Sequence, residues 1–215
     1  MTTQLLTLDQ VCGALPECYD ASTRNEYWGG WVELVERLPK KAEQLGYLDM
    51  RDLSDIAEWG GNQHGVEQRM QSHNTPDEVK SVTSLAIRHL DDPARAMREI
   101  ARMKHWGVAY GSKTLTFMCP SEYAILDRWI RKALVHVIPE ITDGNAGSVV
   151  RGYMGYLDCC RALQRKVAAP PPLGTTDGRW RIADIGQALF EFARSGGVLA
   201  PPAAHQPVGV DAAKG

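Results

Sequence analysis

The sequence lacks any long apolar run and contains few cysteines. No stretch approaches about 18 consecutive apolar residues, so we expect no transmembrane helix. The first ten residues have no basic flank and no apolar core, so no signal peptide is visible. The five cysteines are an odd number, and only Cys159 and Cys160 lie close together. This argues against a disulfide framework, and we expect a cytoplasmic protein, because the cytoplasm keeps thiols reduced.

Several kinds of site are also missing. The six histidines have no ligand spacing with one another or with the cysteines, so no metal site is expected. The chain has no phosphate loop of the Gly-Lys-Ser/Thr kind and no dinucleotide fingerprint, so no cofactor is expected. The cysteines also lack the spacing of an iron–sulfur cluster; they are Cys12, Cys18, Cys119, Cys159 and Cys160.

What is present indicates one helical domain. The chain has 215 residues, of which 44% are hydrophobic, which is enough to build a core. Apolar residues recur at helical spacing, and no clear β pattern or internal repeat is visible. Thr75-Pro76 and Asp92-Pro93 are typical helix starts. We therefore predict an all-α fold, with a domain over residues 1–197 and a disordered tail over residues 198–215, where the chain has little to bury.

The small net charge of −2 hides an uneven distribution. Residues 1–94 carry 16 acids and 8 bases, which gives −8. Residues 95–132 carry 8 bases and 3 acids, which gives +5. A basic block in an acidic protein is the form that a nucleic-acid footprint takes, although a solvated helix face gives the same pattern.

The most informative stretch lies inside the basic block. The glycine-bearing turn at residues 107–111 is expected to join two helices, the second beginning at Ser112. Such a turn, with the positive end of the following helix, makes a phosphate-binding corner. Lys113 is expected in the first turn of that helix, and Asp127 follows 14 residues later, at the start of the next helix.

These two elements, Gly111-Ser112-Lys113 and Ala124-Ile125-Leu126-Asp127-Arg128, resemble the helix-hairpin-helix DNA glycosylase superfamily, and within it the 8-oxoguanine DNA glycosylase branch. The clearest resemblance covers residues 95–137 and implies a helix-hairpin-helix glycosylase-like fold. It also implies catalytic roles for Lys113 and Asp127. A lysine amine with a lowered pKa can attack the sugar and form a Schiff base, which would add lyase activity. A buried carboxylate can stabilise the developing positive charge or manage a proton.

The sequence departs from that family in two places. Ala109-Tyr110-Gly111 stands where the strict hairpin has Gly-x-Gly before the lysine, and the segment from the lysine to the aspartate is a few residues shorter than usual. Taken alone, Asp127 also reads as an ordinary N-cap and Lys113 as a solvated helix lysine.

Further residues are candidates for base and DNA binding, because a flipped base needs stacking surfaces and hydrogen-bonding groups. The candidate base-pocket residues are Trp59, Asn62, Gln63, His64, Tyr153 and Tyr156. Packing in the core is the alternative for Trp59 and the two tyrosines. The candidate DNA-binding residues are Gly107, Gly111, Ser112, Arg128, Arg131 and Lys132.

The sequence therefore predicts a monomeric enzyme that excises a modified base from double-stranded DNA. The shortened catalytic segment and residues 59–64 slightly favour a bulky hypermodified base, such as the glucosylated hydroxymethylcytosine of phage DNA, which would make the activity an anti-phage defence. The alternatives are excision of oxidised guanine in DNA repair, a non-catalytic DNA-binding module, and a helical interaction protein whose basic segment is only solvated.

Overall fold

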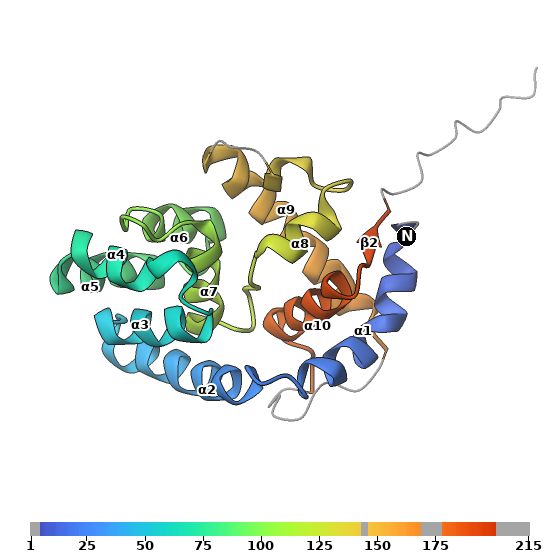
Figure 1. The fold of residues 1–215 in the computed structure, drawn as a ribbon, viewed down its shortest axis with the longest axis horizontal. Helices are drawn as coiled ribbons and strands as arrows, with labels where there is room; N and C mark the ends of the chain where they lie inside the picture. Colours follow the sequence, from blue (N-terminus) through green and yellow to red (C-terminus); the bar gives the residue numbers. More distant parts are fainter. Residues whose placement is uncertain (1–4, 143–145, 169–177, 201–215) are drawn as a thin grey trace, which may run out of the picture.

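The computed structural model describes residues 5–142, 146–168 and 178–200, and these are mostly helical (Figure 1). The α-helices are α1 (Leu8–Ser22), α2 (Trp28–Leu45), α3 (Met50–Trp59), α4 (Val66–His73), α5 (Pro76–Ile87), α6 (Pro93–Ile100), α7 (Val108–Met118), α8 (Arg128–Leu134), α9 (Ala146–Lys166) and α10 (Ile182–Arg194). Two 3-10 helices are η1 (Gln63–Gly65) and η2 (Pro139–Thr142). The predicted helical class is confirmed. Within the described ranges, no helix is both long and apolar enough to cross a membrane.

The helices form two groups (Figure 1). Helices α2 to α7 lie on one side, with α2 packed against α7 and α5 against α6. Helices α1, α8, α9 and α10 lie on the other side, with α10 packed against the other three. The chain passes between the groups at the link from α1 to α2 and again at residues 119–127, just before α8. The predicted catalytic aspartate therefore lies where the chain re-enters the second group.

The helix starts predicted from local signals are confirmed. Thr75 accepts a hydrogen bond from the Glu78 backbone N–H, and the Glu78 side chain accepts one from the Thr75 N–H, with Pro76 at the first helical position. Asp92 caps α6 by accepting from the Arg95 N–H. These bonds satisfy amide donors that a helix leaves unpaired at its N-terminus, which is why such residues mark helix starts.

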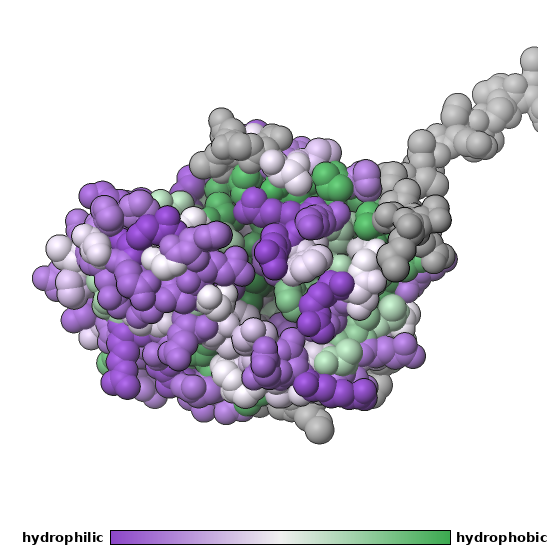
Figure 2. Space-filling model, viewed as in Figure 1, coloured by the Kyte–Doolittle hydropathy of each residue, from purple (hydrophilic) through white to green (hydrophobic). Residues whose placement is uncertain are grey.

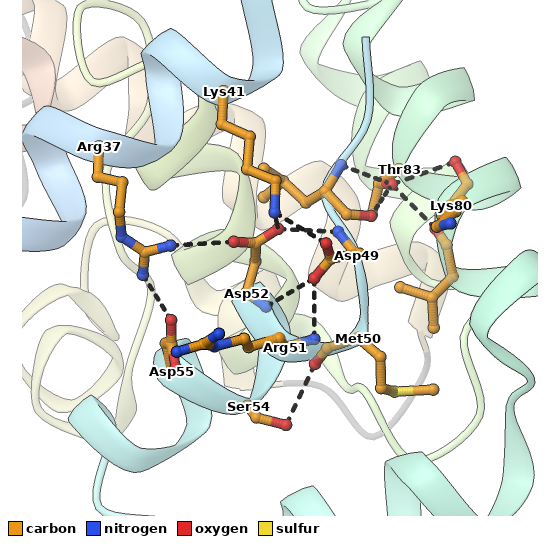
Figure 3. A network of polar contacts seen from close by, with 12 residues as sticks. Arg37, Lys41, Asp49, Met50, Arg51, Asp52, Ser54, Asp55, Lys80 and Thr83 are labelled. Atoms are coloured by element: carbon orange, nitrogen blue, oxygen red, sulfur yellow. Dashed lines mark hydrogen bonds and ion pairs between the residues drawn. The ribbon is translucent and has the colours of Figure 1, made fainter. Parts of the chain in front are cut away.

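An ion network around the buried Asp52 joins α2 to α3 (Figure 3). The Asp52 carboxylate, 1% exposed, lies 3.0 Å from a guanidinium nitrogen of Arg37 and 2.5 Å from Lys41 Nζ. It also accepts from the Asp49 N–H and completes the cap of α3. Two cations compensate the buried charge, and removal of either would leave it poorly paired. The network fixes α3, whose C-terminal end carries Trp59.

The expected boundary of the disordered tail is wrong by a few residues, and a short strand pair was missed. Strands β1 (Leu5–Leu6) and β2 (Val198–Leu199) pair in parallel. Leu199 is only 2% exposed, so burial of an apolar side chain and backbone pairing hold this segment to the domain. Residues 201–215 lie outside the described part of the chain.

Two helix predictions also need correction. Helix α7 begins at Val108, not at Ser112, so Gly111 is helical and its N–H donates to the Gly107 carbonyl at 2.8 Å. Lys113 consequently lies in the second turn of α7. Helix α1, which contains Pro16, was not predicted, although it buries Val11 and Leu15.

Candidate functional site

A cavity of about 480 Å³ lies between the two groups of helices. The α2 to α7 side is mostly hydrophilic in the view of Figure 2, and hydrophobic surface appears between it and the α8 to α10 side. Five of the predicted site residues line the cavity: Trp59, Gln63, Lys113, Asp127 and Arg128. The others on its wall include Asn25, Tyr27, Trp28, Trp31, Gly60, Tyr110, Trp129, Gly186, Gln187, Phe190 and Arg194. The volume falls within the range of about 300–1,000 Å³ typical of small-molecule pockets.

Lys113 is a buried amine at the wall of this cavity. It is 9% exposed, and its Nζ lies 4.7 Å from the centre of the Tyr110 ring. Its stem passes beside the Gly60 backbone, where a Cβ would come within 3.1 Å of Lys113 Cε. Burial lowers the pKa of the Lys113 ammonium, while the charge of Asp127 acts in the opposite direction. Lys113 thus has the environment of an amine that loses its proton more readily than an exposed lysine.

Asp127 occupies the N-cap of α8 and also faces the cavity. Its Oδ1 accepts hydrogen bonds from the backbone N–H groups of Trp129 and Ile130, both at 2.9 Å. Oδ2 receives no hydrogen bond from any residue that the structure describes. Burial raises the pKa of the Asp127 carboxyl, while the two backbone donors and Lys113 lower it. The N-cap prediction is therefore correct for Oδ1, and the carboxylate that carries the second oxygen also lines the cavity.

Ser112 connects the segments that carry the lysine and the aspartate. Its Oγ accepts from the Leu126 N–H at 3.0 Å and donates to the Ala109 carbonyl at 2.9 Å. Ser112 is fully buried. The bond to Leu126 fixes the residue next to Asp127 against the residue next to Lys113. Lys113 and Asp127 form no direct ion pair in the described part of the chain, so their interaction is electrostatic across the cavity wall.

Trp59 serves both the cavity and the core. Its indole N–H donates to the Tyr27 carbonyl at 3.0 Å. Its ring packs against Trp31 and Phe117, with ring centres 5.7 and 5.1 Å away. A Cβ on Gly30 would come within 2.9 Å of Trp59 Cδ1, so the backbone of α2 also packs closely against this ring. The two readings of Trp59 were not exclusive.

The predicted cluster after Trp59 is divided by the structure. Gln63 lines the cavity, and its N–H donates to the Tyr110 hydroxyl at 3.2 Å. Asn62 turns away toward the start of α4, where its Oδ1 accepts from the Glu67 N–H at 3.0 Å. His64 is exposed and is not part of the cavity wall. The placement of Asn62 and His64 in the base pocket is therefore wrong, because this tight loop sends successive side chains in different directions.

Tyr153 and Tyr156 are also not in the cavity. Both are fully buried in the core, and the Tyr153 hydroxyl donates to the Ala124 carbonyl at 2.9 Å. The Tyr156 hydroxyl packs beside Gly186, which does line the cavity. The core reading is correct for both tyrosines. They support the wall from behind, Tyr153 through the segment that leads to Asp127.

Of the predicted DNA-binding residues, Gly111 and Ser112 are buried and cannot contact a ligand at the surface. A Cβ on Gly111 would come within 3.1 Å of Ile100 and 3.2 Å of Met97, so this glycine allows α6 and α7 to pack closely. Gly107 is exposed at the N-terminus of α7, which has no side-chain cap. The first backbone amides of α7 therefore have no side-chain cap, as at helix ends that bind anions, whereas Gly111 and Ser112 are buried behind them.

The basic residues of α8 have two different placements. Arg128 and Lys132 are exposed and lie against the Trp129 ring, at 5.3 and 5.0 Å from its centre. Arg131 is partly buried, which lowers the pKa of its guanidinium, while the charge of Asp127 raises it. Arg128, Trp129 and Lys132 therefore form a basic and aromatic edge, of which Arg128 and Trp129 line the cavity, and Arg131 interacts with Asp127.

The sequence reasoning missed the wall contributed by α10 and by the link from α1 to α2. Asn25 and Gln187 bring amide groups to the cavity, and Arg194 brings a guanidinium that pairs with Glu191 at 3.0 Å. No sequence signal marked them, because residues 25 and 187 meet only through tertiary packing. In the described ranges, no group of three or more His, Cys, Asp or Glu side chains is placed to hold a metal ion.

Comparisons with known proteins identify no relative of this chain. No protein-family model, no curated protein and no solved structure matches the chain.

Proposed function

We propose that this protein is a DNA glycosylase that draws a modified base into the cavity between its two helix groups and cleaves the base from its sugar. The observation that carries the proposal is the placement of Lys113 and Asp127 on one cavity wall. Burial lowers the pKa of Lys113, which favours the free amine that a nucleophile needs, and raises the pKa of Asp127, which makes its carboxylate a stronger base. Perturbed titratable groups gather in this way at catalytic sites. The resemblance of residues 95–137 to helix-hairpin-helix glycosylases supports the same conclusion.

In this mechanism the neutral amine of Lys113 attacks C1′ of the deoxyribose. The C1′–N bond breaks, its electron pair leaves with the base, and the base takes up the proton that Asp127 has accepted from the lysine nitrogen. The Asp127 carboxylate stabilises the positive charge that develops on the sugar and accepts the proton that the lysine nitrogen loses. The free Oδ2 of Asp127 is the oxygen available for this role.

Two features of the surface support DNA as the substrate. The N-terminus of α7, which has no side-chain cap among the described residues, offers backbone amides to a phosphate, and Arg128 and Trp129 of the basic edge line the cavity. A flipped base loses its stacking partners, and aromatic faces such as Trp28, Trp59 and Tyr110 can replace them.

The cavity favours a bulky modified base. Its volume suits a drug-sized ligand, and the amides of Asn25, Gln63 and Gln187 offer donors and acceptors to a hydroxylated substituent. A glucosylated hydroxymethylcytosine meets this description, and its excision would act against phage DNA. Oxidised guanine is the second candidate, supported by the branch of the superfamily that the motifs resemble.

Mass spectrometry of bases released from a panel of modified DNAs tests the proposal. The panel contains glucosylated hydroxymethylcytosine, 8-oxoguanine and unmodified duplexes. We expect free base from one modified DNA, and a covalent protein–DNA adduct on treatment with borohydride that Lys113→Gln abolishes. Asp127→Asn should lower excision by at least about 100-fold, as expected for loss of a charge-stabilising group.

Matched variants control for effects on folding. Asp92→Asn removes a carboxylate from another helix N-cap, and Lys80→Gln removes a lysine that lies against another tyrosine ring. Both should leave excision unchanged. DNA binding without any released base across the panel would instead identify a non-catalytic module, and absence of salt-dependent DNA binding would identify an interaction protein.

A further inference from the structure

Tyr110 is the middle residue of Ala109-Tyr110-Gly111, just before Lys113, and the structure gives its side chain two separate contacts. Tyr110 lies one turn before Lys113 on α7, and its ring is 4.7 Å from the Lys113 ammonium. Its hydroxyl accepts a hydrogen bond from the Gln63 N–H at 3.2 Å. The ring also packs against Trp106, with centres 4.9 Å apart. The side chain is therefore held in place and lines the cavity.

The ring contact bears on the charge state of Lys113. The face of an aromatic ring attracts a cation, so Tyr110 favours the ammonium form that burial disfavours. The charged and titratable groups around this pair are Asp127 before α8, Arg128 and Arg131 on α8, Arg194 on α10 and the buried Tyr156 on α9. Among the residues that the structure describes, none of these groups forms an ion pair with Lys113, so the Tyr110 ring is the contact that faces its nitrogen.

The hydroxyl contact bears on the loop beside the lysine. Gly61, Asn62, His64 and Gly65 all have positive φ angles, from 39° to 82°. This region of backbone space is costly for the two non-glycine residues, so the loop persists only if its surroundings hold it. The Tyr110 hydroxyl supplies one such contact through Gln63, and the Gly60 backbone passes close to both Tyr110 and Lys113.

We propose that Tyr110 is a positioning residue whose ring holds the Lys113 amine and whose hydroxyl holds the residue 60–65 loop beside it. The catalytic benefit of this positioning rests on the proposed function, whereas the contacts of Tyr110 with Lys113 and Gln63 exist without DNA. The two parts are separable, because phenylalanine keeps the ring and loses the hydroxyl, whereas leucine loses both.

Two measurements on the full-length protein without DNA test this proposal. In the first, NMR of protein labelled with ¹³C-lysine follows the Lys113 Cε signal with pH, and Lys113→Arg assigns the signal. Tyr110→Leu should move the titration midpoint of Lys113 to lower pH by about one unit, because the ammonium loses its aromatic partner. Tyr110→Phe should leave the midpoint at its parent value.

In the second measurement, hydrogen exchange followed by NMR reports on the Gln63 amide. Both Tyr110→Phe and Tyr110→Leu should increase its exchange rate by at least about tenfold, since both remove the acceptor of that amide. Tyr47→Leu is the matched control. It removes the ring beside Lys80, at 5.3 Å, and should change neither the Lys113 midpoint nor the exchange of Gln63.

The proposal is overturned if Tyr110→Leu leaves the Lys113 midpoint unchanged, or if Tyr110→Phe shifts it as far as Tyr110→Leu does. It is also overturned if Gln63 exchanges at the parent rate in both variants. Since neither readout uses DNA, failure of this inference is distinguishable from failure of base excision.

Discussion

Replacement of Lys113 by methionine should abolish base excision and at the same time stabilise the folded protein. Methionine keeps an unbranched stem to pack beside Gly60 but carries no charge. The ammonium of Lys113 is buried in the folded state and solvated in the unfolded state, and burial lowers its pKa. The parent protein therefore loses stability by burying this charge.

The sign of the pH dependence follows from proton binding. Because the folded-state pKa lies below the unfolded-state value, the unfolded chain binds more protons between the two values. The stability of the parent relative to Lys113→Met therefore rises as pH increases through that window. The advantage of methionine is largest below the folded-state pKa and disappears above about pH 10.5, the ordinary value for lysine.

The size of the effect scales with the pKa shift. Each unit by which burial lowers the pKa destabilises the parent by about 1.4 kcal/mol. For a protein of this size, that corresponds to a change of about 3–6 °C in melting temperature per unit. Loss of the cation near Asp127 acts in the opposite direction, because the buried carboxylate then lacks its positive neighbour.

Thermal melts of parent and Lys113→Met between pH 6 and pH 10 measure this directly, with borohydride trapping on modified DNA as the activity assay. Lys80→Met, a lysine outside the cavity, should show no gain in melting temperature at either pH. A Lys113→Met protein that melts below the parent at pH 6, with a difference that does not change with pH, would refute the reasoning.

Three further predictions concern the groups around Lys113. Ser112→Ala should lower the free energy of unfolding by about 1–3 kcal/mol in urea titrations, because the buried Leu126 N–H loses its acceptor. It should also slow single-turnover excision. Unchanged values for both would show that Ser112 does not support Asp127. Arg128→Gln combined with Lys132→Gln should reduce the slope of log affinity against log salt by about 2 in DNA-binding titrations; an unchanged slope would show that this edge does not meet DNA. Borohydride trapping should rise with pH with a midpoint below 10.5, because the free amine of Lys113 is the reactive form. It should fall at acid pH as Asp127 is protonated, at a pH above the ordinary pKa of an aspartate. A basic midpoint at or above 10.5 would contradict the burial of the Lys113 charge.

Local signals in the sequence determined most of the helix boundaries. Thr75, Asp92 and Asp127 each begin a helix, because their side chains satisfy amides only two or three residues away. Helix α10, Ile182–Arg194, is marked in the same local way, since its apolar residues follow helical spacing without interruption. The choice of Lys113 and Asp127 as a pair also came from the sequence, through the resemblance of the segments around them to helix-hairpin-helix glycosylases.

Tertiary packing decided what these local signals could not. Helix α1 contains a proline, but it forms because its apolar face is buried against α10, more than 160 residues away in the chain. Gly111 looked like part of a turn, but it is a helical residue whose missing side chain admits Met97 and Ile100 of α6. Tyr153 and Tyr156 could have faced a pocket or the core, and contacts with Ala124 and Gly186 place them in the core. Asn25 and Gln187 meet at the cavity only because α1 and α10 pack together, and nothing in either local sequence encodes that encounter.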